Sequence, residues 1–187
     1  MAKNSRFSKL AALDEIVFHT GDAGNLWGIK NSNTLNTTLS RYARQGLIYR
    51  LYRGLYSLKK AGDLDPYFMG IKALHGSAYV SCESVLFAGG AINQKPCEIT
   101  LVSRASRRFT VAGVRFRSRK LHDRFLYNDA GIEIKNGVRY ATLERAVADL
   151  LYFNPRKHFD ATDSNLINWQ KVRAIADEAG YEINLKI

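Results

Sequence analysis

The sequence predicts an α+β protein with two domains, at residues 1–60 and 64–187. In the first domain, apolar residues recur with a helical period and are followed by the pattern of a short β-hairpin. The second domain alternates strand patterns with helical stretches, which is typical of an antiparallel sheet with flanking helices. A polar, glycine-containing step at residues 59–65 (KKAGDLD) separates the two, as linkers commonly do.

The most informative segment is a polar helix that we expect to begin near Ser32, whose hydroxyl can cap a helix N-terminus. Gly46 ends it, where a left-handed residue costs least. The apolar stripe comprises Leu35, Leu39, Tyr42 and Ala43. The residues between these apolar positions carry amide, hydroxyl and guanidinium groups, which suit base edges and phosphates. They are Asn33, Asn36, Thr37, Ser40, Arg41 and Arg44.

A basic hairpin follows this helix directly. Residues 47–52 (LIYRLY) favour a strand because they are β-branched and aromatic. Arg53-Gly54 favours a turn, since glycine takes positive φ without steric cost, and residues 55–58 return. We therefore expect Arg50 and Arg53 at or near the tip of the hairpin.

Two short helices are predicted ahead of the polar helix. The first runs from Ser8 to His19, with Leu10, Leu13, Ile16 and Val17 at helical spacing. The second passes through Leu26 and Trp27 after a break at residues 20–22. Three helices and a basic hairpin in about sixty residues indicate a winged helix-turn-helix, a module that binds double-stranded DNA.

The net charge of +11 is concentrated in two blocks. Residues 1–62 carry ten Lys and Arg against three Asp and Glu, and residues 95–124 carry nine against two. The rest of the chain is slightly acidic. Two separate basic blocks favour a polyanionic partner.

The second domain is predicted to open with a helix at Pro66 and to carry a short helix capped by Ser81. A buried strand at residues 98–102 precedes a hairpin over residues 107–119, and Asn136-Gly137 turns a second hairpin. Helices are expected after Thr142 and before Gly180, and the terminal EINLKI resembles a strand. Arginines of the first hairpin are candidate contacts for a partner or nucleic acid: Arg107, Arg108, Arg115, Arg117 and Arg119.

We expect no catalytic residue, cofactor or metal site. Glu133-Ile134-Lys135 has the Glu-x-Lys spacing of metal-dependent nucleases, but it runs into the Asn-Gly turn without a partner carboxylate. Ser81, Cys82 and Ser84 lack a placed base for nucleophilic catalysis.

Several ordinary features complete the sequence-based expectations. Cys82 and Cys97 are too few for a disulfide framework or zinc site. Arg145 and Asp149, four apart on one helix, predict a solvated ion pair. Without an apolar run of membrane length or a signal core, the chain is expected to be cytoplasmic and not to contact a membrane.

Nearly the whole chain resembles the AbiEi family of antitoxins from type IV toxin–antitoxin systems. The segment LSRYARQGLIYRLYRGLYSL is similar to the winged helix of that family, including its arginine-glycine wing. AYVSCESVLFAGG is similar to the opening of the second domain of the family, and TLERAVADLLY to the helix after its sheet.

This resemblance implies a transcriptional autorepressor that binds inverted repeats in its own promoter. It implies recognition-helix roles for Asn33, Asn36, Thr37, Ser40, Arg41 and Arg44, and wing roles for Arg50 and Arg53. It also implies that the second domain counteracts a nucleotidyltransferase-like toxin.

Two alternatives stay open at the level of sequence. The strand at residues 115–119 could make the protein an interaction module for an acidic partner or RNA. Less favoured is a nuclease that uses Glu133 and Lys135. The role of the second basic block and the oligomeric state are both left open by the sequence.

Overall fold

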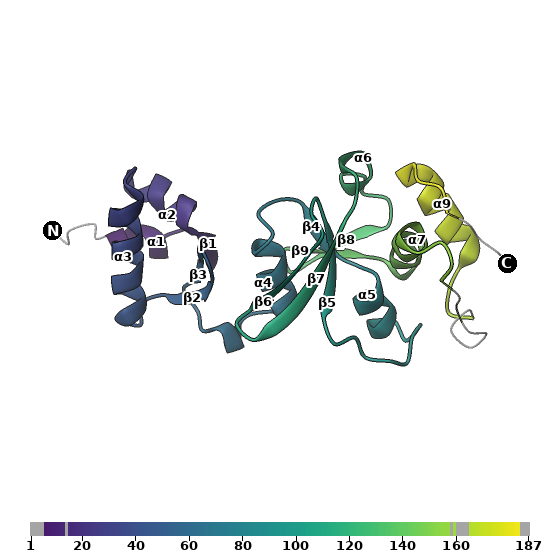
Figure 1. The fold of residues 1–187 in the computed structure, drawn as a ribbon, viewed down its shortest axis with the longest axis horizontal. Coiled ribbons are helices and arrows are strands. Elements are labelled where there is room, and N and C mark those ends of the chain that lie inside the picture. Colours follow the sequence, from purple (N-terminus) through teal and green to yellow (C-terminus); the bar gives the residue numbers. More distant parts are fainter. Residues whose placement is uncertain (1–5, 14, 158, 160–164, 184–187) are drawn as a thin grey trace. The chain divides into compact units, whose positions relative to one another are not determined.

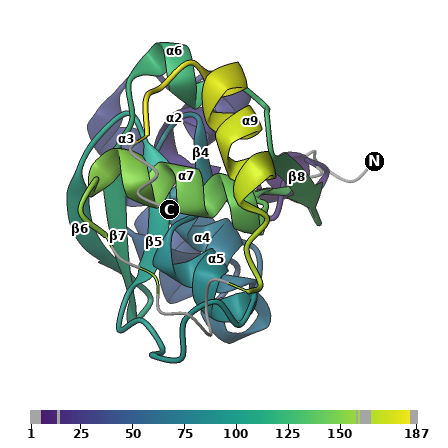
Figure 2. The same cartoon turned by 90° about the vertical axis from the view of Figure 1, so that its right-hand side faces the viewer.

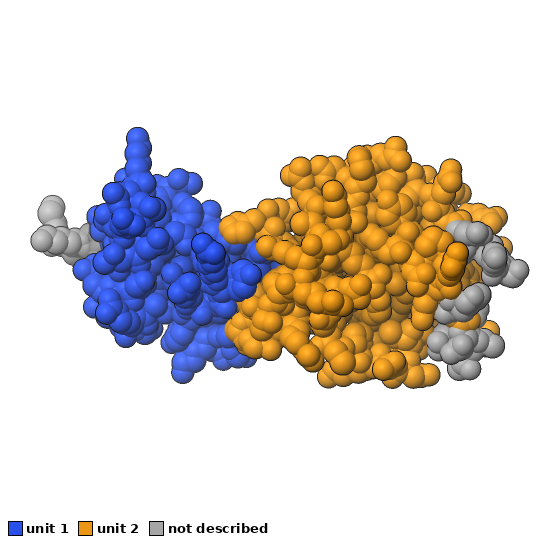
Figure 3. Space-filling view, viewed as in Figure 1, with its two compact units in different colours: residues 1–73 blue, residues 74–187 orange. Residues whose placement is uncertain are grey.

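The computed structural model describes residues 6–13, 15–157, 159 and 165–183. It confirms an α+β protein, built on a three-stranded and a six-stranded sheet (Figure 1). The chain divides into two compact units, Met1–Ala73 and Leu74–Ile187 (Figure 3). Unit 1 therefore includes a 3₁₀ turn, Ala61–Asp63, and helix α4, Pro66–Lys72. This helix begins at proline as predicted, but it belongs to the first unit and not to the second, where it was expected.

Unit 1 folds its first six elements around one small core. These are α1 (Arg6–Ala11), β1 (Val17–His19), α2 (Thr20–Trp27), α3 (Ser32–Arg44), β2 (Tyr49–Tyr52) and β3 (Leu55–Ser57). The strands form an antiparallel sheet in the order β1-β3-β2. Side chains from both the helices and the sheet fill the core, among them Leu10, Phe18, Leu35, Leu39, Tyr42, Ile48 and Tyr56.

The single helix predicted from Ser8 to His19 is wrong beyond Ala11. Val17 and His19 instead pair with Ser57 and Leu55 of β3, and both Val17 and Phe18 are fully buried. Val17 follows Leu10 at helical spacing by coincidence. A strand of three residues is too short to show the alternating pattern that would have identified it. Pairing with β3, which lies far along the chain, decides the strand.

Helix α3 is capped by Asn31 and not by Ser32. The Asn31 Oδ1 atom accepts a hydrogen bond from the Thr34 backbone N–H at 3.0 Å, and Ser32 is the first helical residue. At the other end Gly46 has φ +70°, and the Leu47 N–H donates to the Tyr42 carbonyl at 3.0 Å. A left-handed glycine thus ends the helix where the sequence predicts it.

The sheet of unit 2 is mixed, which corrects the predicted antiparallel sheet. Its order is β6-β7-β5-β4-β9-β8, with parallel pairs at β5-β7 and β4-β9 and antiparallel pairs elsewhere. Local turns explain the two predicted hairpins, whereas tertiary packing decides how hairpins join. The strands are β4 (Ala78–Val80), β5 (Ile99–Ser103), β6 (Arg107–Val111), β7 (Val114–Lys120), β8 (Ile132–Lys135) and β9 (Val138–Ala141).

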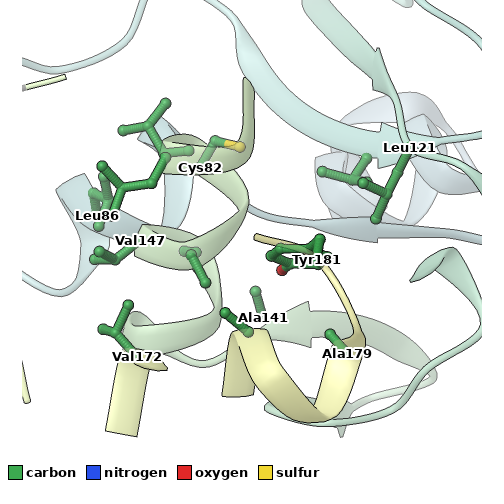
Figure 4. Packing of buried hydrophobic residues seen from close by; sticks show 14 of the residues in the cluster. Cys82, Leu86, Leu121, Ala141, Val147, Val172, Ala179 and Tyr181 are labelled. Atoms are coloured by element: carbon green, nitrogen blue, oxygen red, sulfur yellow. The ribbon is translucent and has the colours of Figure 1, made fainter. Parts of the chain in front are cut away.

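Helices α5, α7 and α9 lie together on one side of this sheet (Figure 2). The unit contains α5 (Glu83–Ala88), α6 (Asp123–Leu126), α7 (Leu143–Phe153) and α9 (Trp169–Ala179). Apolar side chains from α5, α7, α9 and the sheet form one core, which includes Leu86, Val147 and Val172 (Figure 4). Gly180 ends α9 as predicted. Glu182 and Ile183 are not in a strand, and the remainder of EINLKI lies outside the described residues.

Arg145 and Asp149 form a buried ion pair, so the predicted solvated pair is wrong. Both side chains are 0 % exposed, and Arg145 Nε donates to Asp149 Oδ1 at 3.0 Å. The spacing of four residues placed them on one helix face, but the fold turned that face inward. A buried ion pair of this kind needs all its hydrogen-bonding positions filled.

The Asp149 carboxylate receives three further hydrogen bonds. Tyr181 donates to Oδ1 at 2.6 Å, and Tyr79 and Ser81 donate to Oδ2 at 3.0 and 2.7 Å. Ser81 therefore does not cap α5, because its hydroxyl is used here. Cys82 occupies the cap position without a side-chain cap.

The Arg145 guanidinium also binds α6 and the segment that joins α6 to β8. Nη1 donates to the Ala130 carbonyl at 2.7 Å, and Nη2 donates to the Phe125 carbonyl at 3.3 Å and to the Tyr79 hydroxyl at 3.1 Å. Gly131 makes this approach possible, since a Cβ there would lie 2.8 Å from Arg145 Cβ. One arginine thus ties α7 to β4 and to this connecting segment.

Substituting Asp149 by alanine is expected to lower the free energy of unfolding by about 3–5 kcal/mol, because it leaves a buried arginine unpaired. Urea denaturation measures the change. Arg104→Ala, which breaks an exposed ion pair with Asp123 (2.9 Å), should change stability by no more than about 0.5 kcal/mol. Similar losses in the two variants would contradict this role for Asp149.

Burial, together with the negative charge of Asp149, raises the pKa values of Tyr79 and Tyr181 well above their usual value. Above about pH 10 the unfolded chain loses these protons first. The folded chain then binds more protons, so the free energy of unfolding falls as the pH rises. Stability measured from about pH 9 to 11 should fall less steeply for Tyr79→Phe/Tyr181→Phe. The exposed Tyr127→Phe should keep the wild-type slope, and equal slopes in all three proteins would refute the prediction.

Candidate nucleic-acid interface

The outer face of α3 collects all six of the polar and basic side chains that the sequence singles out. Asn33, Asn36, Thr37, Ser40, Arg41 and Arg44 are exposed, while Leu35, Thr38, Leu39 and Tyr42 are buried on the opposite side. At 1.5 Å per residue the row from Asn33 to Arg44 extends for about 16 Å along the helix. One helix therefore offers amide, hydroxyl and guanidinium groups on a single strip of surface.

These side chains are available to a ligand. Within the described part of the chain, the side chains of Asn33, Asn36, Thr37, Ser40 and Arg44 make no hydrogen bond or ion pair. The Arg41 guanidinium lies 5.6 Å from the centre of the Tyr42 ring, which leaves its N–H groups uncommitted. Polar groups that are hydrated in the free protein can exchange water for a polar ligand at little cost.

The tip of the β2–β3 hairpin is held by the start of α2. The carbonyl of Gly54 accepts hydrogen bonds from the Thr20 N–H at 2.9 Å and from its hydroxyl at 3.3 Å. Gly54 has φ +75°, which explains the glycine at this turn. Arg53 lies in the turn of this hairpin, as predicted, whereas Arg50 lies on β2 opposite Tyr56, and both are exposed. The anchor to Thr20 joins residues 34 apart and has no local sequence signal.

Electrostatics favour an anionic ligand at α3 and the hairpin. Residues 32–58 contain four arginines and no acidic residue. Three acids elsewhere in unit 1 have partners outside this segment: Glu15 pairs with Lys72 at 3.3 Å, Asp22 accepts from the His19 N–H, and Asp65 caps α4. The positive charge of the segment is therefore not neutralised by neighbours on its own elements.

The arginines predicted on the first hairpin of unit 2 do not form one uniform surface. Arg115 and Arg117 are exposed on β7 and make no ion pair within the described residues. Arg108, which is opposite Arg117 in the register, pairs with Glu98 at 3.2 Å. Arg107 lies on the other face of β6, with its guanidinium 4.9 Å from the Phe109 ring centre.

Arg119 is the most enclosed of this set. It pairs with Glu83 of α5, and its guanidinium lies 5.6 Å from the Phe153 ring centre. Its charge is thus shared with an acid inside unit 2. The strand register puts Arg108, Arg115, Arg117 and Arg119 on one face of the sheet, where Arg119 pairs with α5, and it puts Arg107 on the other face.

The residues considered for catalysis are buried or have partners within the protein. Glu133 and Lys135 pair with each other at 2.8 Å on the surface. Ser84 Oγ accepts from the Thr100 N–H at 2.7 Å, and burial together with the charge of Asp149 raises the pKa of the fully enclosed Cys82 thiol. Both cysteines are free thiols, with Cys97 exposed. Within the described ranges, no group of three or more His, Cys, Asp or Glu residues is placed to hold a metal ion.

No helix within the described residues has both the length and the apolar character needed to cross a bilayer.

No protein-family model matches this chain, and no curated protein matches it significantly.

Proposed function

We propose that unit 1 is a winged helix-turn-helix that binds double-stranded DNA, with α3 as its recognition helix and the β2–β3 hairpin as its wing. The supporting observation is the exposed, acid-free face of α3, with six polar or basic side chains in one strip. The element order α1-β1-α2-α3-β2-β3, with β1 completing the sheet of the wing, agrees with such a module.

In this proposal, different side chains contribute to affinity for DNA and to sequence specificity. Arg50 and Arg53 on the hairpin suit phosphate oxygens, which supply most of the salt-dependent affinity. Asn33 and Asn36 near the start of α3 suit base edges, and Arg41 and Arg44 suit guanine or phosphate. Short side chains such as Thr37 and Ser40 let the helix approach the groove closely.

The resemblance to the AbiEi antitoxins extends this proposal to a biological role. The protein would repress transcription of its own operon by binding an inverted repeat in the promoter. Unit 2 would counteract a nucleotidyltransferase-like toxin. No cofactor or metal enters either activity.

A gel shift against the DNA upstream of the gene, in rising salt and with excess unrelated DNA, tests the DNA-binding proposal. Arg41→Ala/Arg53→Ala should weaken binding by about tenfold or more, because each arginine that binds a base or phosphate contributes about 1–3 kcal/mol. The slope of log affinity against log salt should become shallower by about 0.9 for each phosphate that the variant no longer neutralises.

Arg115→Ala/Arg117→Ala is the matched control, since it removes two exposed arginines from unit 2. It should retain sequence-specific binding. If this control lost as much affinity as Arg41→Ala/Arg53→Ala, binding would not depend on α3 and the hairpin. Wild-type binding that unrelated DNA competes away completely would also refute a specific repressor.

The antitoxin role is tested separately, by growth of cells that express the neighbouring toxin gene together with this protein. Arg41→Ala/Arg53→Ala should still restore growth, because toxin neutralisation is assigned to unit 2 and not to the DNA-binding face. Loss of rescue in this variant, at equal protein level, would contradict the division of roles. Failure of the wild-type protein to restore growth would refute the antitoxin role itself.

A further inference from the structure

The two edge strands of the unit 2 sheet, β6 and β8, have opposite consequences for pairing with a second copy of the chain. An edge strand presents unpaired backbone groups that another strand can bind. β6 (RRFTV) carries Arg107 and Arg108 and no acidic residue, so a second β6 offers them no opposite charge. β8 reads Ile-Glu-Ile-Lys, in which an acid and a base flank Ile134 symmetrically.

The backbone of β8 presents Ile134 to the open edge. Gly131, just before the strand, accepts a hydrogen bond from the Thr142 N–H at 2.8 Å. In an antiparallel ladder the residues bonded to the neighbour alternate, so Glu133 and Lys135 also face β9. Glu133 is opposite Tyr140 and Lys135 is opposite Val138. The N–H and C=O of Ile134 therefore point away from the sheet.

The side chains of β8 are unusually exposed for a strand. Ile134 is 73 % exposed, more than any other large hydrophobic residue in the described parts of the chain. Glu133 and Lys135 project from the other face of the strand and are 52 % and 67 % exposed. The hydrogen bond from Lys135, together with its charge, holds the pKa of Glu133 below its usual value, so the carboxylate is ionised at neutral pH.

We propose that β8 is a self-association edge, at which two copies of the chain pair antiparallel about a two-fold axis through Ile134. Ile134 would lie opposite Ile134 of the second copy, and the two residues would exchange both backbone hydrogen bonds. Each Glu133 would lie opposite a Lys135. The two six-stranded sheets would then join into one continuous sheet.

Charge complementarity is what selects a second copy as the occupant. Within one strand Glu133 already neighbours Lys135 at 2.8 Å. Two-fold pairing adds an opposite charge across the interface to each residue, so the four charges alternate in sign around a square. Opposite charges directly across an antiparallel pair stabilise it, and like charges destabilise it. The Asn136-Gly137 turn directly after Lys135 limits the interface to a few residues, so the association is concentration-dependent.

This pairing does not rest on the proposed DNA binding, because it involves unit 2 alone. It would give the protein two-fold symmetry, which is the symmetry of an inverted repeat. Sedimentation velocity of the full chain without DNA, from low to high micromolar concentration, tests it. The wild type should shift from monomer towards dimer as its concentration rises.

Charge reversal at the edge provides the decisive variants. Glu133→Lys and Lys135→Glu each place like charges opposite one another and should raise the dimer dissociation constant at least tenfold. An equimolar mixture of these two variants should form a heterodimer. The double variant Glu133→Lys/Lys135→Glu should recover wild-type self-association, since exchanging the charges restores complementarity.

Controls separate the edge from net charge and from DNA binding. Asp177→Lys, on the exposed face of α9, changes the net charge by as much as Glu133→Lys and should sediment as the wild type, as should Arg41→Ala/Arg53→Ala. A wild type that stays monomeric throughout would overturn the proposal. So would dimers that survive either single reversal, or single variants whose mixture fails to pair while their circular dichroism shows native folding.

Discussion

The buried ion pair between Arg145 and Asp149 is the interaction on which the rest of unit 2 depends. Taking two charges out of water costs several kcal/mol for each ion unless their hydrogen-bonding positions are filled. Here two tyrosines and a serine donate hydrogen bonds to the Asp149 carboxylate, and backbone carbonyls accept hydrogen bonds from the Arg145 guanidinium. These partners come from β4, from the residues that follow β4 and α9, from α6, and from the segment between α6 and β8. Satisfying one pair of charges thus fixes where these parts of the unit meet.

Unit 1 follows the opposite arrangement, since its polar groups are kept at the surface. One side of α3 packs against the core through Leu35, Leu39 and Tyr42. The caps at Asn31 and Gly46 provide hydrogen bonds for backbone groups at the two ends of the helix. The outer side is then free to carry polar residues that contribute little to folding. This separation leaves the outer side of α3 free to vary in sequence without loss of stability, as the proposed recognition role would require.

The two sheet edges of unit 2 show how charge placement governs association. β6 carries two arginines and no acid to pair with them, whereas Glu133 and Lys135 on β8 would complement each other in the proposed two-fold register. The Glu-x-Lys spacing that invited a catalytic interpretation has a surface setting, in which each side chain has the other as its partner. In the proposed self-association edge, the pattern would have a structural use that needs no metal ion.

The sequence by itself determined the local elements of this protein. The stripe of α3, its glycine stop, the Arg53-Gly54 turn and the Asn136-Gly137 hairpin all follow from neighbours within a few residues. Tertiary structure decided the features that depend on contacts between residues far apart in the sequence. β1 is a strand because it pairs with β3, and the sheet of unit 2 is mixed because β7 lies between β5 and β6. Ser81 does not cap a helix because its hydroxyl donates to Asp149. Arg145 and Asp149 illustrate the reason, because helical spacing reveals which residues share a face but not whether water or protein covers it.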